Sequence, residues 1–415
     1  MDMINKAIVF SDMHLGKGDG YLFSRDERYA GNRKAVKALI ASVGSIDELI
    51  LDGDILELSM AGLDEAYREL KKFFKLLAEV GGIKKIVFLP GNHDHHFWRS
   101  LVEQIEIDGK IRAGHLPPGH GNYTKKFVDQ RYSSHDPEHG SYLLFPHLWP
   151  KEEEGGDVPE FVVEYPHHFL KVPRLPGLVG EEWQYYLITH GHFLEELFKP
   201  VNYLIEPDGL AQLEAFNNLW LESFNYYLGH SDELSRQVRE LEQRFLEGGR
   251  DAKGKAKAIF DAAYYNLKKS IGLKCPWTLL VKFILKKFIT LVPEEKMGRS
   301  KLRGSDVTDQ LLNSVKDYIE KYIIKSYVKD LANVEPEKGV TRKKITPTPF
   351  TFIFGHTHIP FSTNIEIQGD TYPIINTGGW IRSDGDATGK GKYAGVVVID
   401  NQGAHWKSLK GQLDN

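Results

Sequence analysis

The chain has a single cysteine, Cys275, among its 415 residues, so no intramolecular disulfide can form. This excludes the disulfide-stabilised folds of small secreted proteins and is consistent with a reducing compartment. No histidine or aspartate motif surrounds Cys275 to make it a reactive thiol. We therefore expect this cysteine to serve only in packing or at an interface.

Long hydrophobic runs are also absent. No segment offers the roughly 18 uncharged apolar residues that a membrane-spanning helix needs. The first ten residues lack the basic start and the apolar stretch of a secretory leader, so we expect a cytoplasmic protein. The charge is nearly balanced, with 53 basic and 57 acidic residues, and a net charge of −4 predicts no particular partner.

Five short apolar runs are each followed by residues that commonly bind metals, and each run predicts a strand. The runs and the polar residues after them are Lys6–Phe10 with Asp12 and His14, Glu48–Leu51 with Asp54, Lys85–Leu89 with Asn92 and His93, Tyr185–Ile188 with His190, and Thr351–Phe354 with His356 and His358. Ligands bind at the carboxyl ends of strands in an open α/β sheet. We therefore expect these polar residues to meet at one edge.

The types of these residues favour two divalent cations. Asp54 has two carboxylate oxygens and can bridge two ions, while Asn92 offers a neutral carbonyl oxygen. Imidazole, carboxylate and amide ligands without thiolate suit manganese, iron, zinc or cobalt. Two such cations would exceed the charge of the two carboxylates, and the resulting positive site would attract a phosphate and activate water to attack it.

In this order, the motifs resemble those of the calcineurin-like metallophosphoesterase superfamily. They are Asp12-X-His14, Gly53-Asp54, Gly91-Asn92-His93-Asp94, His190-Gly191 and Gly355-His356-X-His358. The resemblance implies a four-layer αββα sandwich built on two mixed sheets. It also implies that one metal is held by Asp12, His14, Asp54 and His358, and a second by Asp54, Asn92, His190 and His356. By the same resemblance, His93 contacts the phosphate and protonates the leaving group, while Asp94 orients His93.

The pattern of helices and strands predicts a catalytic core interrupted by an insertion. The core comprises residues 1–192 and 346–415, with a loop-rich stretch at 113–180, and residues 193–345 form a helical insertion. Because this insertion lies between the fourth and fifth motifs, we expect it to cap the site; a remote appendage is the alternative. Its expected helices are Leu210–Leu228, Asp232–Leu246, Ala256–Ser270, Trp277–Leu291 and Val307–Leu331. Expected elements of the core include helices Asp26–Val43 and Leu63–Glu79 and strands Tyr142–Phe145, Phe161–Tyr165, Thr371–Asn376 and Ala394–Asp400.

Most other histidines are expected to have packing or surface roles. His95 and His96 follow the third motif and His192 follows the fourth, but the resemblance gives them no metal to bind. The remaining ones lie in the proline-rich stretch and are His115, His120, His135, His139, His147, His167 and His168.

The insertion contains a basic stretch. Asp251–Arg303 has 13 Lys or Arg against 4 Asp or Glu, and within it the segment 276–292 predicts a basic amphipathic helix that carries a tryptophan. Such a helix can contact a membrane surface, pack in a core with its lysines extended to water, or form an oligomer contact.

The sequence therefore predicts a metal-dependent phosphoesterase, but it leaves the substrate open. A lipid-linked or nucleotide-type phosphate ester or pyrophosphate fits the possible membrane contact. The basic stretch also permits a nuclease, because Lys and Arg neutralise nucleic-acid phosphates. A non-catalytic scaffold is a third interpretation, but every ligand position is filled. The oligomeric state is not predicted.

Overall fold

The computed structural model describes residues 2–18, 20–23, 32–59, 61–119, 123–150, 158–175, 183–194, 207, 209–222, 226, 309–324, 349–381 and 394–409. Most of the insertion, including the expected helices Asp232–Leu246, Ala256–Ser270 and Trp277–Leu291, Cys275 and the basic segment 276–292, lies outside these residues. So does the expected start of the first helix at Asp26.

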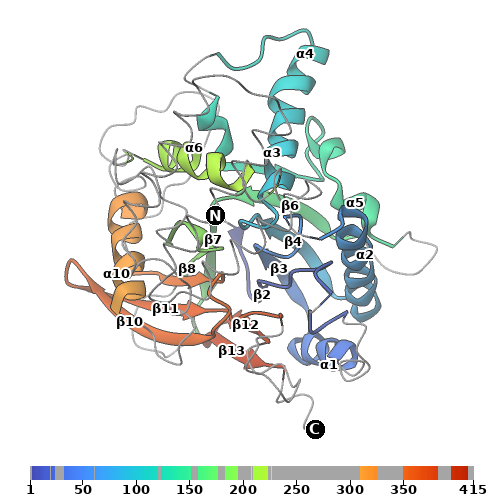
Figure 1. Cartoon of the computed structure of the whole chain (residues 1–415). Coiled ribbons are helices and arrows are strands. Elements are labelled where there is room, and N and C mark those ends of the chain that lie inside the picture. The colour runs from blue at the N-terminus through green and yellow to red at the C-terminus, as the bar shows by residue number, and fades with distance from the viewer. Residues whose placement is uncertain are drawn as a thin grey trace, which may run out of the picture.

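Two mixed sheets form the centre of the molecule (Figure 1). The larger sheet has the strand order β13-β12-β2-β3-β4-β6-β5 and the smaller sheet β1-β7-β8-β9-β11-β10. The larger sheet contains Ala7–Phe10 (β2), Ile46–Asp52 (β3), Ile83–Leu89 (β4), Gln130–Ser133 (β5), Glu160–Tyr165 (β6), Gly395–Asp400 (β12) and Gly403–Ser408 (β13). The smaller contains Asp2–Met3 (β1), His168–Pro173 (β7), Trp183–Thr189 (β8), Thr351–Phe354 (β9), Phe361–Ile367 (β10) and Asp370–Asn376 (β11).

Apolar side chains cover both faces of each sheet, because the strands carry nearly continuous apolar runs. Val9 and Ile50 of the larger sheet and Ile188 and Ile353 of the smaller belong to one buried cluster between the sheets. The opposite faces are covered by helices: Phe10 meets Phe73 of α2 (Leu63–Val80), and Phe352 meets Tyr318 of α10 (Asp309–Tyr318). The expected four-layer αββα architecture is thus confirmed.

The helices on the larger sheet are set by sequence signals. In α2 (Leu63–Val80), Ala66, Leu70, Phe73 and Leu77 recur at helical spacing and are all buried. Acidic residues in the first turn favour the positive end of the helix, and Gly81 follows the last residue with a φ of 69°. The other helices are Asn32–Val43 (α1), His95–Glu103 (α3), Lys110–Arg112 (α4), Phe145–Leu148 (α5), Leu210–Trp220 (α6) and Asp309–Tyr318 (α10).

Short helical turns complete the described elements. A π-helical turn at Gln104–Gly109 joins α3 to α4, and another at Ile319–Ile324 extends α10. Short 3₁₀ turns occupy Thr124–Phe127, Gly140–Tyr142 and His192–Leu194.

The predicted strand Tyr142–Phe145 is wrong. This stretch contains the end of a 3₁₀ turn and the start of α5. Phe145 is fully buried and stacks on Phe97 with ring centroids 4.6 Å apart, so the aromatic run fills the core between helix and sheet. The loop-rich stretch 113–180 also supplies β6 to one sheet and β7 to the other, so it links the two sheets.

Two described pieces of the insertion pack on the core. α6 lies beside the start of α3, and α10 flanks the smaller sheet (Figure 1). None of the helices among the described residues is long and apolar enough to cross a membrane.

Candidate metal centre

The five predicted motifs meet where the carboxyl ends of the parallel strands of both sheets come together. The loop after β2 bonds to the loop after β3, since the amide of Asp12 donates to the carbonyl of Gly53 at 3.0 Å and that of His14 to Asp54 at 2.8 Å. In the smaller sheet, the amide of Gly355 donates to the carbonyl of His190 at 3.0 Å. Backbone hydrogen bonds therefore fix these loops.

Most of the predicted ligands have an unusual backbone conformation. Among the described non-glycine residues, seven have a positive φ, and five of these are predicted ligands: Asp12, His14, Asp54, His356 and His358. Each such conformation costs on the order of 1–2 kcal/mol for an ordinary side chain. Strain of this kind clusters at functional sites, where the surrounding structure enforces it.

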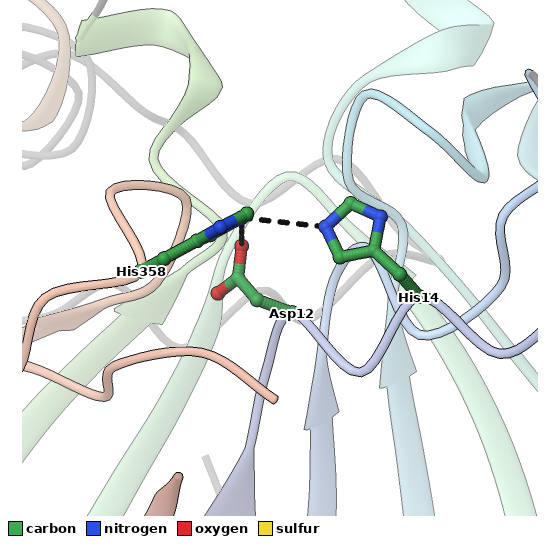
Figure 2. A group of neighbouring side chains, drawn as sticks. All are labelled: Asp12, His14 and His358. Atoms are coloured by element: carbon green, nitrogen blue, oxygen red, sulfur yellow. Dashed lines mark hydrogen bonds and ion pairs between the residues drawn. The ribbon is translucent and has the colours of Figure 1, made fainter. Parts of the chain in front are cut away.

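A first group of side chains consists of Asp12, His14 and His358. Figure 2 shows the three pointing toward one another, with the two histidines on opposite sides of the aspartate. His358 Nε2 lies 3.2 Å from Asp12 Oδ1 and 3.3 Å from His14 Nε2. Two imidazole nitrogens and a carboxylate that converge in this way can hold one cation.

A second group consists of Asp54, His190 and His356, with Asn92 beside it. His190 Nε2 lies 3.2 Å from Asp54 Oδ2, 3.3 Å from His356 Nδ1 and 3.2 Å from Asn92 Oδ1. Asn92 thus adds its amide oxygen to the three side chains. These four residues are the predicted second ligand set.

Asp54 lies between the two groups. Its Oδ2 is fully buried and, among the described residues, receives no hydrogen bond of good geometry. Yet it lies 3.2 Å from His190 Nε2, 3.7 Å from His14 Nε2 and 4.0 Å from His93 Nε2. A buried oxygen surrounded by imidazole nitrogens matches the donor set of a divalent transition-metal cation, and its place between the groups suits a bridge.

In two predicted ligands, an oxygen atom holds the ring nitrogen Nδ1, so that Nε2 faces the centre. His14 Nδ1 lies 2.9 Å from a Glu57 oxygen and His190 Nδ1 lies 3.1 Å from the carbonyl oxygen of Asp52. An oxygen acceptor requires that Nδ1 carry the proton, which leaves Nε2 free to bind a metal. The residues present therefore fit the divalent cations that the sequence predicts.

The ring of His93 lies at the edge of the same centre, and a residue that the motifs did not single out holds it. His93 Nδ1 lies 2.8 Å from Glu57 Oε1 and 2.7 Å from Ser59 Oγ, and Ser59 in turn donates to Glu57 at 2.5 Å. Glu57 is fully buried. Its two oxygens accept hydrogen bonds from two imidazole rings, those of His14 and His93. The spacing Gly53-Asp54-X-X-Glu57 was the available sequence signal.

Asp94, which was predicted to orient His93, is held by backbone amides. Its carboxylate accepts hydrogen bonds from the backbone amides of Gly91, Ile55 and Leu56 at 2.6, 2.8 and 3.2 Å. Asp94 precedes α3, and its side chain turns toward the neighbouring loop after β3. The carboxylate of Glu57 lies beside the ring of His93, and that of Asp94 ties two motif loops together.

The buried charges at the centre shift one another's pKa. Burial alone would raise the pKa of Asp54, but the imidazole of His190 holds it well below its usual value. Burial would lower the pKa of His190, but the charge of Asp54 raises it to about 10. A cation bound here would have to displace the proton of His190, so cation affinity should rise with pH.

Glycines allow the motif loops to approach closely. Gly53 has a φ of 72°, and a Cβ at this position would overlap the ring of His190. At Gly91 a Cβ would overlap Asp54. These two glycines are thus required by the positions of the predicted ligands.

The other histidines are mostly in packing positions, as expected. His192 and His167 are buried, and His168 is a buried partner of Glu48 and Glu164. His115, His135 and His147 are exposed, His139 is partly exposed, and His120 lies outside the described residues. His95 and His96 contact the insertion and are considered below.

Comparison with known proteins supplies one match. The model of a family described as calcineurin-like phosphoesterase matches residues 6–246, which is more than half of the 415 residues. The match includes the first four motifs but not the fifth, whose His356 and His358 are brought to the centre by the fold. No curated protein shows a significant match to the chain.

Proposed function

The chain belongs to the calcineurin-like phosphoesterase family, and from this premise we propose that it hydrolyses a phosphate ester or pyrophosphate bond with two divalent cations. The family implies a metal-dependent phosphoester hydrolase. The number of cations, the residue roles and the substrate class are our proposal.

One observation carries the proposal: two groups of ligand-type side chains lie side by side with one buried carboxylate oxygen between them. Asp54 Oδ2 is 3.7 Å from His14 of the first group and 3.2 Å from His190 of the second. Two neighbouring cations would activate a water molecule and stabilise the negative charge that develops on the phosphate.

The side chains of the chain itself supply the remaining steps. His93 directs its Nε2 toward the centre, 4.0 Å from Asp54 Oδ2, while Glu57 accepts the hydrogen bond of its Nδ1. In this orientation His93 can donate a proton from Nε2 to the oxygen of the leaving group. The backbone amide of His93 also donates to Asp54 Oδ1 at 2.8 Å. This hydrogen bond fixes the position of the proton donor relative to the bridging carboxylate.

The depth of the centre favours a slender substrate. Asp12, His14, Asp54, Asn92, His190 and His356 are at most 3% exposed, and only the side chain of His358 reaches 11%. We propose a small or lipid-linked phosphate compound, because a phosphate on a flexible arm can reach this depth more readily than one on a folded nucleic acid. Contact with a lipid surface through segment 276–292 stays a prediction, which flotation with anionic vesicles would check.

The test combines cation removal with a substrate panel. The panel comprises p-nitrophenyl phosphate, bis(p-nitrophenyl) phosphate, a UDP-sugar and short single-stranded DNA. We expect hydrolysis of at least one small compound to be lost after chelation and restored by Mn²⁺, Co²⁺, Zn²⁺ or Fe²⁺. Asp54→Asn should abolish it, whereas Glu79→Gln, which changes a side chain 45% exposed at the surface, should not. Activity that persists in a preparation shown to contain no metal would contradict the proposal.

A further inference from the structure

Residues 209–222 of the insertion lie against the beginning of α3, immediately after the third motif. Glu214 of α6 and Glu222, two residues beyond its end, are both buried, at 1% and 3% exposed. Glu214 Oε1 lies 2.7 Å from His95 Nε2, and Glu222 Oε1 lies 3.0 Å from His95 Nδ1. Glu222 Oε2 also lies 2.7 Å from His96 Nδ1.

Both nitrogens of the His95 ring therefore donate to carboxylates of the insertion, and the ring carries a positive charge. Burial alone would lower the pKa of His95, but the charge of Glu214 and its hydrogen bond raise it to about 10. A buried cation at the start of a helix is unfavourable by desolvation and by the helix dipole. Carboxylates of the insertion compensate for this charge, so this part of the insertion is integral to the core.

Glu214 also reaches the fourth motif. Its Oε2 accepts a hydrogen bond from the hydroxyl of Tyr165 at 2.7 Å, and that hydroxyl lies 3.2 Å from His192 Nε2. His192 follows His190 by two residues, and the two rings are 5.7 Å apart. One oxygen of this carboxylate thus holds the start of α3, which follows the loop of Asn92, and the other reaches the loop of His190 through the hydroxyl of Tyr165 at the end of β6.

The ligands that these two loops supply, Asn92 and His190, both belong to the second group. Asn92 Oδ1 and His190 Nε2 are 3.2 Å apart. The side chains of the first group come from other loops, after β2 and β9, and the hydrogen bonds of Glu214 with the described residues reach neither of them. A change at Glu214 should therefore affect the two sites unequally.

We propose that Glu214 is a positioning residue of the second cation site, which it serves by holding the loops of Asn92 and His190 in register. The proposal rests on the two-cation function above and adds a role for the insertion. Glutamine at position 214 has one acceptor oxygen and no charge. With that oxygen on His95, its NH₂ group faces Tyr165, whose hydroxyl can no longer donate to position 214, so the hydrogen bonds toward His192 must reverse.

The test measures cation binding, independent of turnover. Metal-free full-length protein is titrated with Mn²⁺ by calorimetry, and we expect two sites in the wild type. Glu214→Gln should weaken one of them by about 10- to 100-fold, the effect typical of residues that orient metal ligands, and leave the other unchanged. In a His358→Ala background, which removes a ligand of the first site, the same weakening should appear in the remaining isotherm. Gln212→Ala, an exposed position on the same helix, is the matched control.

The possible results distinguish the role of Glu214 from the proposed function. Two unchanged sites in folded Glu214→Gln, or equal weakening of both, would overturn the role of Glu214. A wild type that binds no Mn²⁺ would instead contradict the proposed function. Should Glu214→Gln fail to fold, Tyr165→Phe decides, because it removes only the hydroxyl between Glu214 and His192. Wild-type affinity at both sites in folded Tyr165→Phe would then overturn the proposal.

Discussion

Glu57 offers the sharpest test of how the centre is built, because its two oxygens hold two imidazole rings with different tasks. Oε2 accepts from His14 Nδ1 at 2.9 Å and Oε1 from His93 Nδ1 at 2.8 Å. Glu57→Gln keeps the shape of the side chain but replaces one oxygen by an NH₂ group. One of the two rings must then face a donor in place of an acceptor.

The expected magnitude follows from which ring loses its acceptor. If the amide faces His14, the ring must move its proton to Nε2, and cation affinity falls. If it faces His93, Nδ1 must accept from the amide and the ring is no longer stabilised as a cation by Glu57, so His93 becomes a weaker proton donor and turnover falls. A hydrogen bond to a charged group contributes about 1.5–3 kcal/mol, which corresponds to about a 10- to 150-fold loss in one of these two quantities.

The assay measures both quantities on the same protein. Cation affinity is obtained by titration of the metal-free variant, and kcat at saturating Mn²⁺ with the best substrate of the panel. Glu79→Gln makes the same chemical change at an exposed surface pair with Lys37 and should leave both quantities unchanged. Wild-type cation affinity together with wild-type kcat in Glu57→Gln would refute the assignment of Glu57 to the two rings.

Three further predictions concern stability and cation binding. Because the predicted ligands come from both sheets, chelation should lower the Tm and added Mn²⁺ should raise it. At a free Mn²⁺ concentration of 100 times Kd, the free energy of unfolding should increase by about 2.7 kcal/mol. A Tm independent of Mn²⁺ would contradict this. Gly53→Ala should abolish Mn²⁺ binding, because a Cβ would overlap His190. Gly44→Ala has a similar φ of 80° and no atom within 4 Å of the added Cβ, so it should lower only the stability. Equal Mn²⁺ affinity in the two variants would show that the overlap with His190 does not matter. His168→Gln should destabilise by about 3 kcal/mol, since it breaks a buried ion pair with Glu48 at 2.7 Å. Burial would lower the pKa of His168, but Glu48 raises it from 6.5 to about 9, so the stability difference from wild type, measured by urea unfolding, should be full below pH 6.5 and shrink as the pH rises through 9; a difference that grows with pH would show the sign to be wrong.

The sequence predicted those parts of the fold that depend on local signals. Apolar runs that end in Asp, Asn or His predicted β2, β3, β4, β8 and β9, and the helical spacing of Leu70, Phe73 and Leu77 predicted α2. The same motifs predicted which side chains meet at the centre, because parallel strands deliver their carboxyl ends to a common edge.

Other features depended on contacts that no local pattern contains. The partners of His95, Glu214 and Glu222, follow it by 119 and 127 residues, so nothing next to His95 indicates a buried ion pair. Likewise, the resemblance assigned the orientation of His93 to its neighbour Asp94, and nothing in the local sequence indicated that the loop after β3 also brings Glu57 to within 2.8 Å of the His93 ring. The aromatic run at Tyr142–Phe145 carried no signal that separates a strand from a short helix that fills the core.

The left-handed backbone at five predicted ligands limits how this centre could ever be lost. Aspartate and histidine are among the few side chains that tolerate such angles, and both also bind metals. Alanine at Asp12 or His356 would remove the donor atom and keep the strain, while glycine would relieve it. In a homologue that lost the activity, we therefore expect glycine or asparagine at these positions, because the loops would keep their left-handed backbone without the metal ligands.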